Sequence, residues 1–283
     1  MKYKKLILCL ISLLLVVGLI TYNAICVAPH KLTIREETLK SDKFDKSLDG
    51  LTIAFFSDVH YGNFINDDDI DKLIDTINII NPDVVIFGGD LIDRFSQHPI
   101  PVEQREILSD KLSNIEAKID KYAVLGNHDE DVQPAKDEVN KILTNAGFKV
   151  IENTNVQISN GTDKCINLIG IDSMLCGTPD IASAYEGIAD GNYTIAVSHC
   201  PDIFNNIDTT ITDYVLSAHS HGGQVYLPLI NIFYRPYGCE KYFRGKHHSN
   251  NATLDITNGS GLTNKSIRLF ADAEVVFYKL EAN

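Results

Sequence analysis

Phe56-Ser57-Asp58-Val59-His60-Tyr61-Gly62 is the stretch around which the rest of the sequence is organised. It continues an apolar run, Leu51 to Phe56, which predicts a buried strand. Asp58 and His60 are two residues apart, so on an extended backbone both side chains leave on the same side. A carboxylate and an imidazole that converge at a strand end form half of a metal site. The same arrangement, a strand followed by Asp, Asn or His, recurs at four later points in the chain.

The first half of the chain alternates apolar strands with amphipathic helices. Strands are predicted at 51–56, 84–87 and 122–125. Three helices are predicted between and after them: one begins at Asn66, a second has an apolar face from Leu108 to Ile119, and a third lies near 133–146. The acidic run Asp67 to Asp69 suits a helix start better than a cation site. Fully apolar strands in this order predict an α/β fold with a sheet covered on both faces. After Gly147 short strands are predicted at 148–151, 155–159, 165–171, 193–198, 213–217, 252–257, 265–270 and 274–280.

The N-terminal segment is basic and then apolar. The lysines near residue 1 are followed by an uncharged stretch from Leu6 to Ala28, which is long enough to span a bilayer. The lysines predict a cytoplasmic N-terminus and an extracytoplasmic body. A cleaved signal peptide is the alternative, but Cys26-Val27-Ala28 is a poor cleavage site. We therefore expect an uncleaved anchor at 1–28, a connector with a first edge strand at 29–50, and a catalytic domain at 51–283.

The charge argues against a nucleic-acid partner, and the cysteine content argues against a disulfide-rich fold. The 283 residues carry a formal net charge of −13, and without the three N-terminal lysines 22 basic residues face 38 acidic ones, or −16. Such a body is repelled by nucleic acid, so no nucleic-acid partner is expected. Six scattered cysteines do not predict a disulfide framework; most are expected to be buried thiols, although Cys165 and Cys176 could pair in an oxidising compartment.

Seven side chains suited to metal binding follow predicted strands. Of nine histidines, five fall at strand ends, His128 included. Strands of packed sheets bring such ends together, so side chains distant in sequence can converge. Carboxylates, imidazoles and one amide suit Mn²⁺, Fe or Zn²⁺, and their number fits two ions about 3.5–4 Å apart, the arrangement used in phosphoester hydrolysis. The candidate metal ligands are Asp58, His60, Asp90, Asn127, His199, His219 and His221.

The order of these motifs resembles the calcineurin-like metallophosphoesterase family. The residues that carry the likeness are Asp58-x-His60, Gly89-Asp90, Gly126-Asn127-His128-Asp129, His199 and His219-x-His221. The likeness runs from about Leu48 to the C-terminus, and the flanking sequence is similar to membrane-attached bacterial phosphodiesterases, including UDP-diacylglucosamine pyrophosphohydrolases. One departure is Ala218, where the family usually has Gly.

The resemblance implies a fold, a ligand set and a mechanism. The fold is an αββα sandwich of two packed mixed β-sheets flanked by helices. One ion would be bound by Asp58, His60, Asp90 and His221, and the second by Asp90, Asn127, His199 and His219. A hydroxide between the ions would attack phosphorus. His128 would contact the phosphoryl or leaving group, and Asp129 would orient it.

We expect hydrolysis of a phosphodiester or pyrophosphate, with Mn²⁺ favoured and an envelope or lipid-linked substrate. A broad phosphomonoesterase or nucleotidase and a catalytically silent metal-binding envelope protein remain as alternatives. Four arginines, Arg94, Arg235, Arg244 and Arg268, could hold a second phosphate, although a surface or structural role is favoured for each. An apolar rim after Gly223-Gln224 could receive an acyl chain, although a plain core strand and loop is the favoured interpretation. Its members are Tyr226, Leu227, Leu229, Ile230, Ile232, Phe233 and Tyr234.

Overall fold

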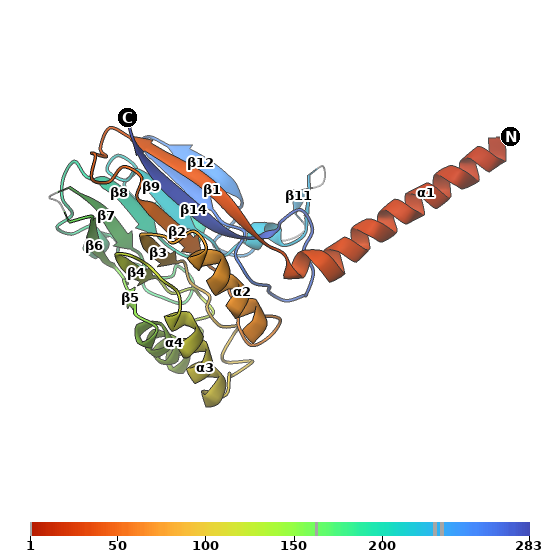
Figure 1. Cartoon of the computed structure of the whole chain (residues 1–283), viewed down its shortest axis with the longest axis horizontal. Helices are drawn as coiled ribbons and strands as arrows, with labels where there is room; N and C mark the ends of the chain where they lie inside the picture. The colour runs from red at the N-terminus through yellow and green to blue at the C-terminus, as the bar shows by residue number, and fades with distance from the viewer. Residues whose placement is uncertain (1, 162–163, 229–230, 233–234) are drawn as a thin grey trace.

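A long apolar helix projects from a two-sheet body (Figure 1). The computed structural model describes residues 2–161, 164–228, 231–232 and 235–283. Helix α1 (Lys2–Tyr22) has no buried residue, and the helical stretch Lys2–His30 that it opens is long and apolar enough to cross a membrane. A π-helical turn (Asn23–Val27) and a 3₁₀ turn (Ala28–His30) then lead into the body.

Two six-stranded mixed sheets make up the body. The first has the order β1-β14-β2-β3-β4-β5, in which β2, β3, β4 and β5 are parallel. Its strands are β1 (Leu32–Ser41), β2 (Thr52–Phe56), β3 (Val84–Phe87), β4 (Asp120–Ala123), β5 (Phe148–Val150) and β14 (Ala273–Ala282). The second has the order β12-β13-β9-β8-β7-β6. Its strands are β6 (Thr154–Ser159), β7 (Cys165–Gly170), β8 (Tyr193–Val197), β9 (Tyr214–Ser217), β12 (Gly245–Ser249) and β13 (Ala252–Ile256).

Alternation along β2 shows why the layers form. Ala54 and Phe56 point to the outer face and pack with the apolar stripes of three helices, whereas Ile53 and Phe55 point to the core between the sheets. The helices are α2 (Asp67–Asn78), α3 (Val102–Ser113) and α4 (Gln133–Asn145). The outer face of the second sheet is covered by α5 (Ile181–Ala184) and a 3₁₀ turn (Pro201–Asn205). The expected αββα sandwich is therefore confirmed.

Two local predictions had different outcomes. Asn66 caps α2 with a reciprocal capping box to Asp69, so the acidic run is a helix start. The strand predicted at 265–270 is wrong: this segment is a loop with one isolated bridge, Leu269 to Val225. Strand β12 and the short pair β10 (Tyr226–Leu227) and β11 (Asn231–Ile232) were not predicted. The six cysteines are free, and Cys165 and Cys176 do not pair.

A buried carboxylate joins the two sheets. Asp255 of β13 is fully buried and accepts two hydrogen bonds from the Arg35 guanidinium of β1, at 3.0 and 3.1 Å. The hydroxyls of Tyr214 and Tyr278 donate to the same carboxylate at 3.1 and 2.9 Å. One charge-assisted network therefore holds both sheets in register.

Replacing Asp255 with Ala should destabilise the body without touching the candidate site. Arg35 keeps its ion pairs with Glu37 and Glu274, but it loses its buried partner, and the hydroxyls of Tyr214 and Tyr278 lose their acceptor. Buried donors left without an acceptor should cost about 3 kcal/mol in total. Urea unfolding in detergent measures the change, and Tyr278→Phe, which removes one hydrogen bond, should cost only about 1 kcal/mol. Equal losses in the two variants would contradict this account of the network.

Candidate metal centre

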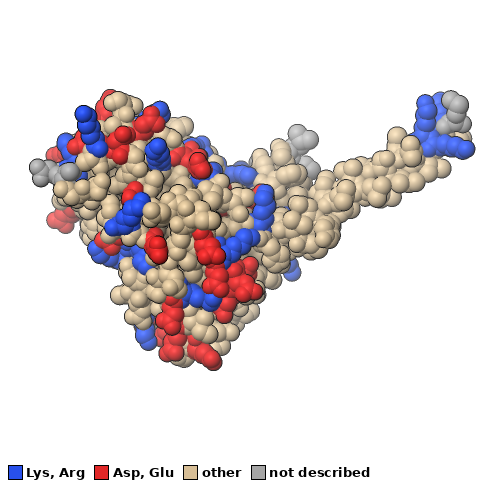
Figure 2. Space-filling view, in the orientation of Figure 1, with Lys and Arg blue, Asp and Glu red and all other residues tan. Residues whose placement is uncertain are grey.

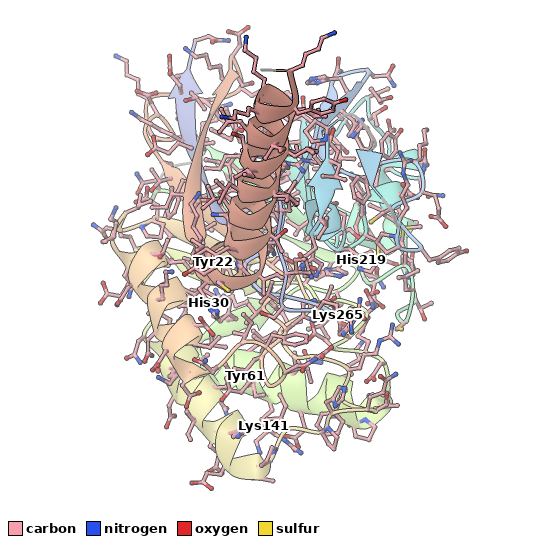
Figure 3. All side chains as sticks on the ribbon, turned by 90° about the vertical axis from the view of Figure 1, so that its right-hand side faces the viewer. Tyr22, His30, Tyr61, Lys141, His219 and Lys265 are labelled. Carbon is pink, nitrogen blue, oxygen red and sulfur yellow. The ribbon has the colours of Figure 1, made fainter. Side chains whose placement is uncertain are left out.

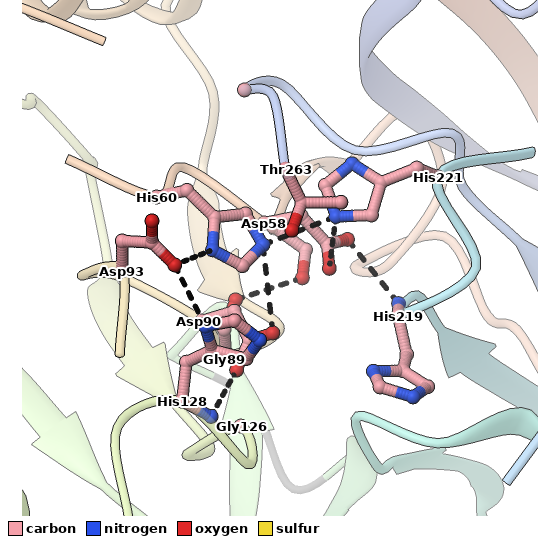
Figure 4. Close-up of polar contacts among 12 residues, drawn as sticks. Asp58, His60, Gly89, Asp90, Asp93, Gly126, His128, His219, His221 and Thr263 are labelled. Carbon is pink, nitrogen blue, oxygen red and sulfur yellow. Dashed lines mark hydrogen bonds and ion pairs between the residues drawn. The ribbon is translucent and has the colours of Figure 1, made fainter. Parts of the chain in front are cut away.

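The metal-ligand candidates meet at the carboxyl edge of both sheets, and Figure 4 labels Asp58, His60, Asp90, His219 and His221 among them. Asp58 and His60 follow β2, Asp90 follows β3, and Asn127 lies just beyond β4. The other three, His199, His219 and His221, follow β8 and β9 of the second sheet. Parallel strands end at a common edge, so the packing of the two sheets brings the seven side chains together.

The side chains form two groups of metal-binding atoms on either side of Asp90. In the first, the Nε2 atoms of His60 and His221 are 3.0 Å apart, and His221 Nε2 is 3.5 Å from Asp58 Oδ1. In the second, His199 Nε2 is 3.1 Å from Asp90 Oδ2 and 3.1 Å from an imidazole nitrogen of His219. Within each group the potential ligand atoms lie within 4.8 Å of one another. Asp90 Oδ2 is also 3.6 Å from His60 Nε2, so this carboxylate faces both groups.

Five of these residues stand on left-handed backbone. φ is +53° at Asp58, +51° at His60, +59° at Asp90, +66° at His219 and +51° at His221. Non-glycine residues held in this region cost about 1–3 kcal/mol each, and such strain concentrates at functional sites. The strand ends therefore turn sharply to aim these side chains at one point.

The polar atoms around the site fit bound cations. Asp58 Oδ1 and Asn127 Oδ1 are buried and have no hydrogen-bond partner among the described residues. His199 Nδ1 is 2.8 Å from the Gly88 carbonyl and His219 Nε2 is 3.0 Å from the Tyr237 carbonyl. With protons on these nitrogens, each imidazole turns its other nitrogen to the site, as metal-binding histidines do. The chemistry and burial of the donor set thus suit divalent metal ions.

Burial and the Asp90 carboxylate control protonation here. Burial lowers the pKa of His60 to about 3 and that of His219 to about 4, and it also lowers the pKa of His221. Burial would lower the pKa of His199 too, but Asp90 raises it to about 10. Neutral imidazoles are the metal-binding form, so three of the four are ready to bind. The buried negative charge of Asp90 favours a positive charge beside it, and a bound cation would supply that charge.

Comparison with known proteins agrees with this geometry. The sequence profile of the calcineurin-like phosphoesterases matches residues 51–223. The chain belongs to this family. The uncharacterized metallophosphoesterase YkuE of Bacillus subtilis (strain 168) is 28% identical over 255 residues, covering 90% of this chain and 87% of the relative. YkoQ of the same organism, another uncharacterized metallophosphoesterase, is 28% identical over 244 residues, covering 81% and 83%.

One relative is a transmembrane protein that contains a metallophosphoesterase domain. A zebrafish (Danio rerio) transmembrane protein with a metallophosphoesterase domain is 25% identical over 277 residues, covering 94% of this chain and 61% of the relative. Membership of the family, together with the residues grouped at the strand ends, makes this chain a metal-dependent phosphoesterase.

His128 of the phosphoesterase is held by a residue that the sequence did not single out. Its Nδ1 lies 3.1 Å from Asp93 Oδ1, and Asn63 donates to the other Asp93 oxygen at 2.7 Å. Burial would lower the pKa of His128, but Asp90 and Asp93 raise it above its ordinary value. Asp93 stands three residues after Asp90 in the stretch Gly89 to Arg94, and that spacing is the signal that could have pointed to it.

The orienting role predicted for Asp129 is wrong. Its carboxylate accepts backbone N–H groups of Asp90 at 2.7 Å, Leu91 at 2.8 Å and Gly126 at 3.0 Å. Asp129 is fully buried, and burial raises its pKa to about 7. These bonds leave it facing main chain instead of His128, so it fixes the backbone that carries Asp90.

A glycine-containing segment that the sequence did not reveal packs on Asp58. The Gly261 N–H donates to the Asp58 carbonyl at 2.8 Å. A Cβ at Gly259 would lie 2.7 Å from the Asp58 Cβ, and a Cβ at Gly261 would lie 1.9 Å from the Val59 carbonyl oxygen. The segment Asn258–Gly261 therefore approaches as closely as it does only because glycine stands at both positions.

Arg268 supports this segment and is not available to a phosphate. The side chain is fully buried and donates to the carbonyls of Ala271 at 2.5 Å, Asn258 at 3.1 Å and Gly261 at 2.5 Å. The suggestion that Arg268 holds a second phosphate is therefore wrong, because its donors face main-chain carbonyls.

The other three arginines differ in whether they line the active-site cleft. Arg94 is exposed and lines the active-site cleft, which has a volume of about 370 Å³. Arg235 donates to the Glu240 carbonyl at 2.8 Å, and Arg244 lies 4.4 Å over the ring of Tyr226. The cleft is lined by His60, Arg94, Asn127, His128, Leu175, His219, Ser220, His221, Gly223, Gln224, Val225, Pro236, Tyr237, Thr263, Asn264, Lys265 and Ile267. Of the suggested phosphate-binding arginines, Arg94 alone lines it.

The suggested apolar rim falls largely outside the described residues. Leu229, Ile230, Phe233 and Tyr234 lie outside them, and the Ile232 side chain is not described. Tyr226 and Leu227 are half-buried, and the residue before them, Val225, lines the cleft.

A separate acidic cluster contains its own cation. Glu130, Glu152 and Asp172 bring carboxylate oxygens within 4.8 Å of one another, and the Lys136 ammonium pairs with Glu130 at 2.6 Å and Glu152 at 2.7 Å. Burial nevertheless raises the pKa of Glu130 to about 8. Burial therefore favours the protonated form of Glu130, whereas the Lys136 ammonium favours its ionised form.

Glu130 should make the protein less stable as pH rises. Its folded pKa lies above its unfolded value, so its stabilising effect is complete at low pH and is lost as pH rises through about 8. The difference in free energy of unfolding between Glu130→Gln and the wild type should shift in favour of the variant from pH 5.5 to 9. Unfolding by urea in detergent at several pH values measures it. A pH-independent difference would show that Glu130 does not titrate in this range.

Proposed function

We propose that this phosphoesterase hydrolyses a phosphodiester or pyrophosphate bond at a dinuclear centre with Asp90 as the bridging ligand. The observation that carries the proposal is that Asp90 faces both groups of ligand atoms. Asp58, His60 and His221 would complete one cation site. Asn127, His199 and His219 would complete the other, and the unpartnered Asn127 Oδ1 supports that role.

The chain itself contributes proton transfer and charge. When bound, the two divalent cations polarise the phosphoryl group and supply an activated water. Asp93 accepts the proton on His128 Nδ1 and favours the imidazolium, whose Nε2 can donate its proton to the leaving oxygen and leave a neutral imidazole. The raised pKa of His128 favours the protonated form that this step requires. Arg94 adds a positive charge to the cleft wall where a further phosphate oxygen would lie.

The size of the cleft supports a diester or pyrophosphate. A volume of about 370 Å³ leaves room for groups on both sides of the reacting phosphorus. Beyond the ligand groups, the cleft is lined by two exposed cations, Arg94 and Lys265, which could neutralise a second anionic group. We propose Mn²⁺ as the native metal, on the grounds of the mixed oxygen and nitrogen ligands.

The N-terminal helix supports a substrate at the membrane. Blue side chains of lysine cap the free end of α1, whereas its length is apolar (Figure 2). We propose that α1 is a single-pass anchor, that its lysine end is cytoplasmic, and that the body is extracytoplasmic. Anchoring raises the effective concentration of lipid-linked substrates near the cleft. The substrate proposed is therefore an envelope or lipid-linked phosphoester.

Asp90→Asn should remove metal from both positions. Loss of the bridging charge should lower activity by more than about 100-fold, since even indirect changes at metal sites cost 10–100-fold. Elemental analysis and Mn²⁺ titration measure the loss, and circular dichroism should show a folded body. Asp110→Asn, an exposed change on α3, is the matched control. Unchanged metal content in Asp90→Asn would rule out Asp90 as the bridge.

His128→Ala should slow substrates with poor leaving groups most, because an activated aryl group needs little protonation. Asp93→Asn should show the same pattern more weakly, since the imidazole remains but loses its carboxylate partner. Rates across a series of aryl leaving groups measure both variants. Metal content should not change; its loss in His128→Ala would instead make His128 a ligand.

The substrate class can be tested on the wild-type protein. Purified enzyme with Mn²⁺ should hydrolyse a bis-aryl phosphate faster than an aryl monophosphate. In vesicles it should prefer a lipid diester to a soluble nucleotide diester. A preference for monophosphates would favour a phosphomonoesterase or nucleotidase, and no hydrolysis of any phosphoester by metal-loaded protein would favour a silent metal-binding protein.

A further inference from the structure

The base of α1 is docked against the body instead of hanging from a flexible linker. Ala24 and Ala28 are only 3% exposed, and the backbone N–H of Arg268 donates to the Ala24 carbonyl at 2.9 Å. The Lys72 ammonium donates to the His30 carbonyl at 2.5 Å. Contacts of this kind on both sides of the turn fix the direction in which α1 leaves the body.

The loop that receives α1 also forms a wall of the active-site cleft. Thr263, Asn264, Lys265 and Ile267 line the cleft, and the backbone N–H of the next residue, Arg268, makes the contact with Ala24. The Arg268 side chain ties this loop to the segment Asn258–Gly261. Figure 3 looks from the side toward which α1 projects, and Lys265 of this loop is labelled below and to one side of Tyr22 at the end of the helix. One wall of the cleft is therefore continuous with the loop on which the anchor docks.

The length of α1 sets the level of the bilayer surface. The lysines at positions 2, 4 and 5 stay outside the hydrocarbon, so the apolar stretch is counted from Leu6. About 20 residues from Leu6, at about 1.5 Å each, span a hydrocarbon core of about 30 Å. The hydrocarbon therefore ends within the turn Asn23–Val27, and Tyr22 lies just before its edge, where a tyrosine suits the interface. The rest of the docked turn and the loop that receives it come next, at the depth of the lipid headgroups.

Four exposed apolar side chains gather at this level. They are Tyr22 (62% exposed), Ile25 (49%), Val27 (42%) and Phe270 (54%). We call these four residues the collar. Phe270 lines the groove between the body and the base of α1, together with Asn23 and Ala28. The collar is continuous with the apolar surface of α1, so the same bilayer would cover it.

We propose that the collar lies in the headgroup layer of the leaflet that holds the end of α1, and that the cleft takes its phosphoester directly from that leaflet. The inference rests on the proposed function for the role of α1 and for the substrate. Contact is mainly apolar, because the nearby Lys31 is paired with Asp272 at 2.5 Å. Seating of the collar should therefore depend little on salt or on anionic lipid.

Tryptophan fluorescence can test the collar, because the chain contains no tryptophan. We would place one in full-length protein as Phe270→Trp and reconstitute it in vesicles of phosphatidylcholine and phosphatidylglycerol. Ile211→Trp, at an apolar residue 44% exposed on the loop before β9, is the matched control away from the cleft. Ile25→Trp provides a second collar probe if Phe270→Trp does not fold.

Emission at a collar probe should be blue-shifted and quenched by phosphatidylcholine brominated near the headgroup, in high or low salt. The control should emit as in water and resist the quencher. A collar probe as exposed as the control would overturn the proposal. The measurement needs no catalysis, so a quenched collar in a protein that ignores lipid diesters would uphold the surface and reject the substrate class alone.

Discussion

The buried carboxylate of Asp90 is the constraint on which the site depends. It lies where two sheets meet, is almost completely shielded from water, and draws His199 and His128 toward it. Three further buried carboxylates, those of Asp58, Asp93 and Asp129, lie around it. Burial of so much negative charge is unfavourable unless cations or main-chain donors compensate it. Asp129 is compensated by backbone N–H groups, whereas Asp58 and Asp90 face the imidazoles.

Unusual backbone conformations place the ligands around the buried Asp90 carboxylate. Strand ends twist into the left-handed region to aim the ligands, and glycines at 259 and 261 let a neighbouring segment press on Asp58. The guanidinium of Arg268 then fixes that segment through carbonyl groups. The strain is held by rigid parts of the fold, as precise ligand placement requires.

Much of this arrangement follows from local sequence signals. Apolar runs that end in Asp, Asn or His locate the strands and the edge where the ligands gather, because strand ends of packed sheets converge. What failed depends on contacts between distant segments. The apolar residues at 267–270 read as a strand, but burial of Arg268 among carbonyls holds them in a loop. Asp129 is next to His128 in sequence and Asp93 is 35 residues away, yet the course of the backbone brings Asp93 to the imidazole and turns Asp129 away from it.

The strand order has a consequence for synthesis of the protein. β14, from the C-terminal part of the sequence, lies between β1 and β2 and pairs with β1 over ten residues. While the ribosome delivers the chain, β1 therefore has no neighbour until more than two hundred residues have followed it. Unpaired strand edges invite association with other chains. A nascent body that emerges beside a membrane would thus rely on rapid completion, or on a chaperone, to keep β1 and β2 apart from foreign strands until β14 arrives.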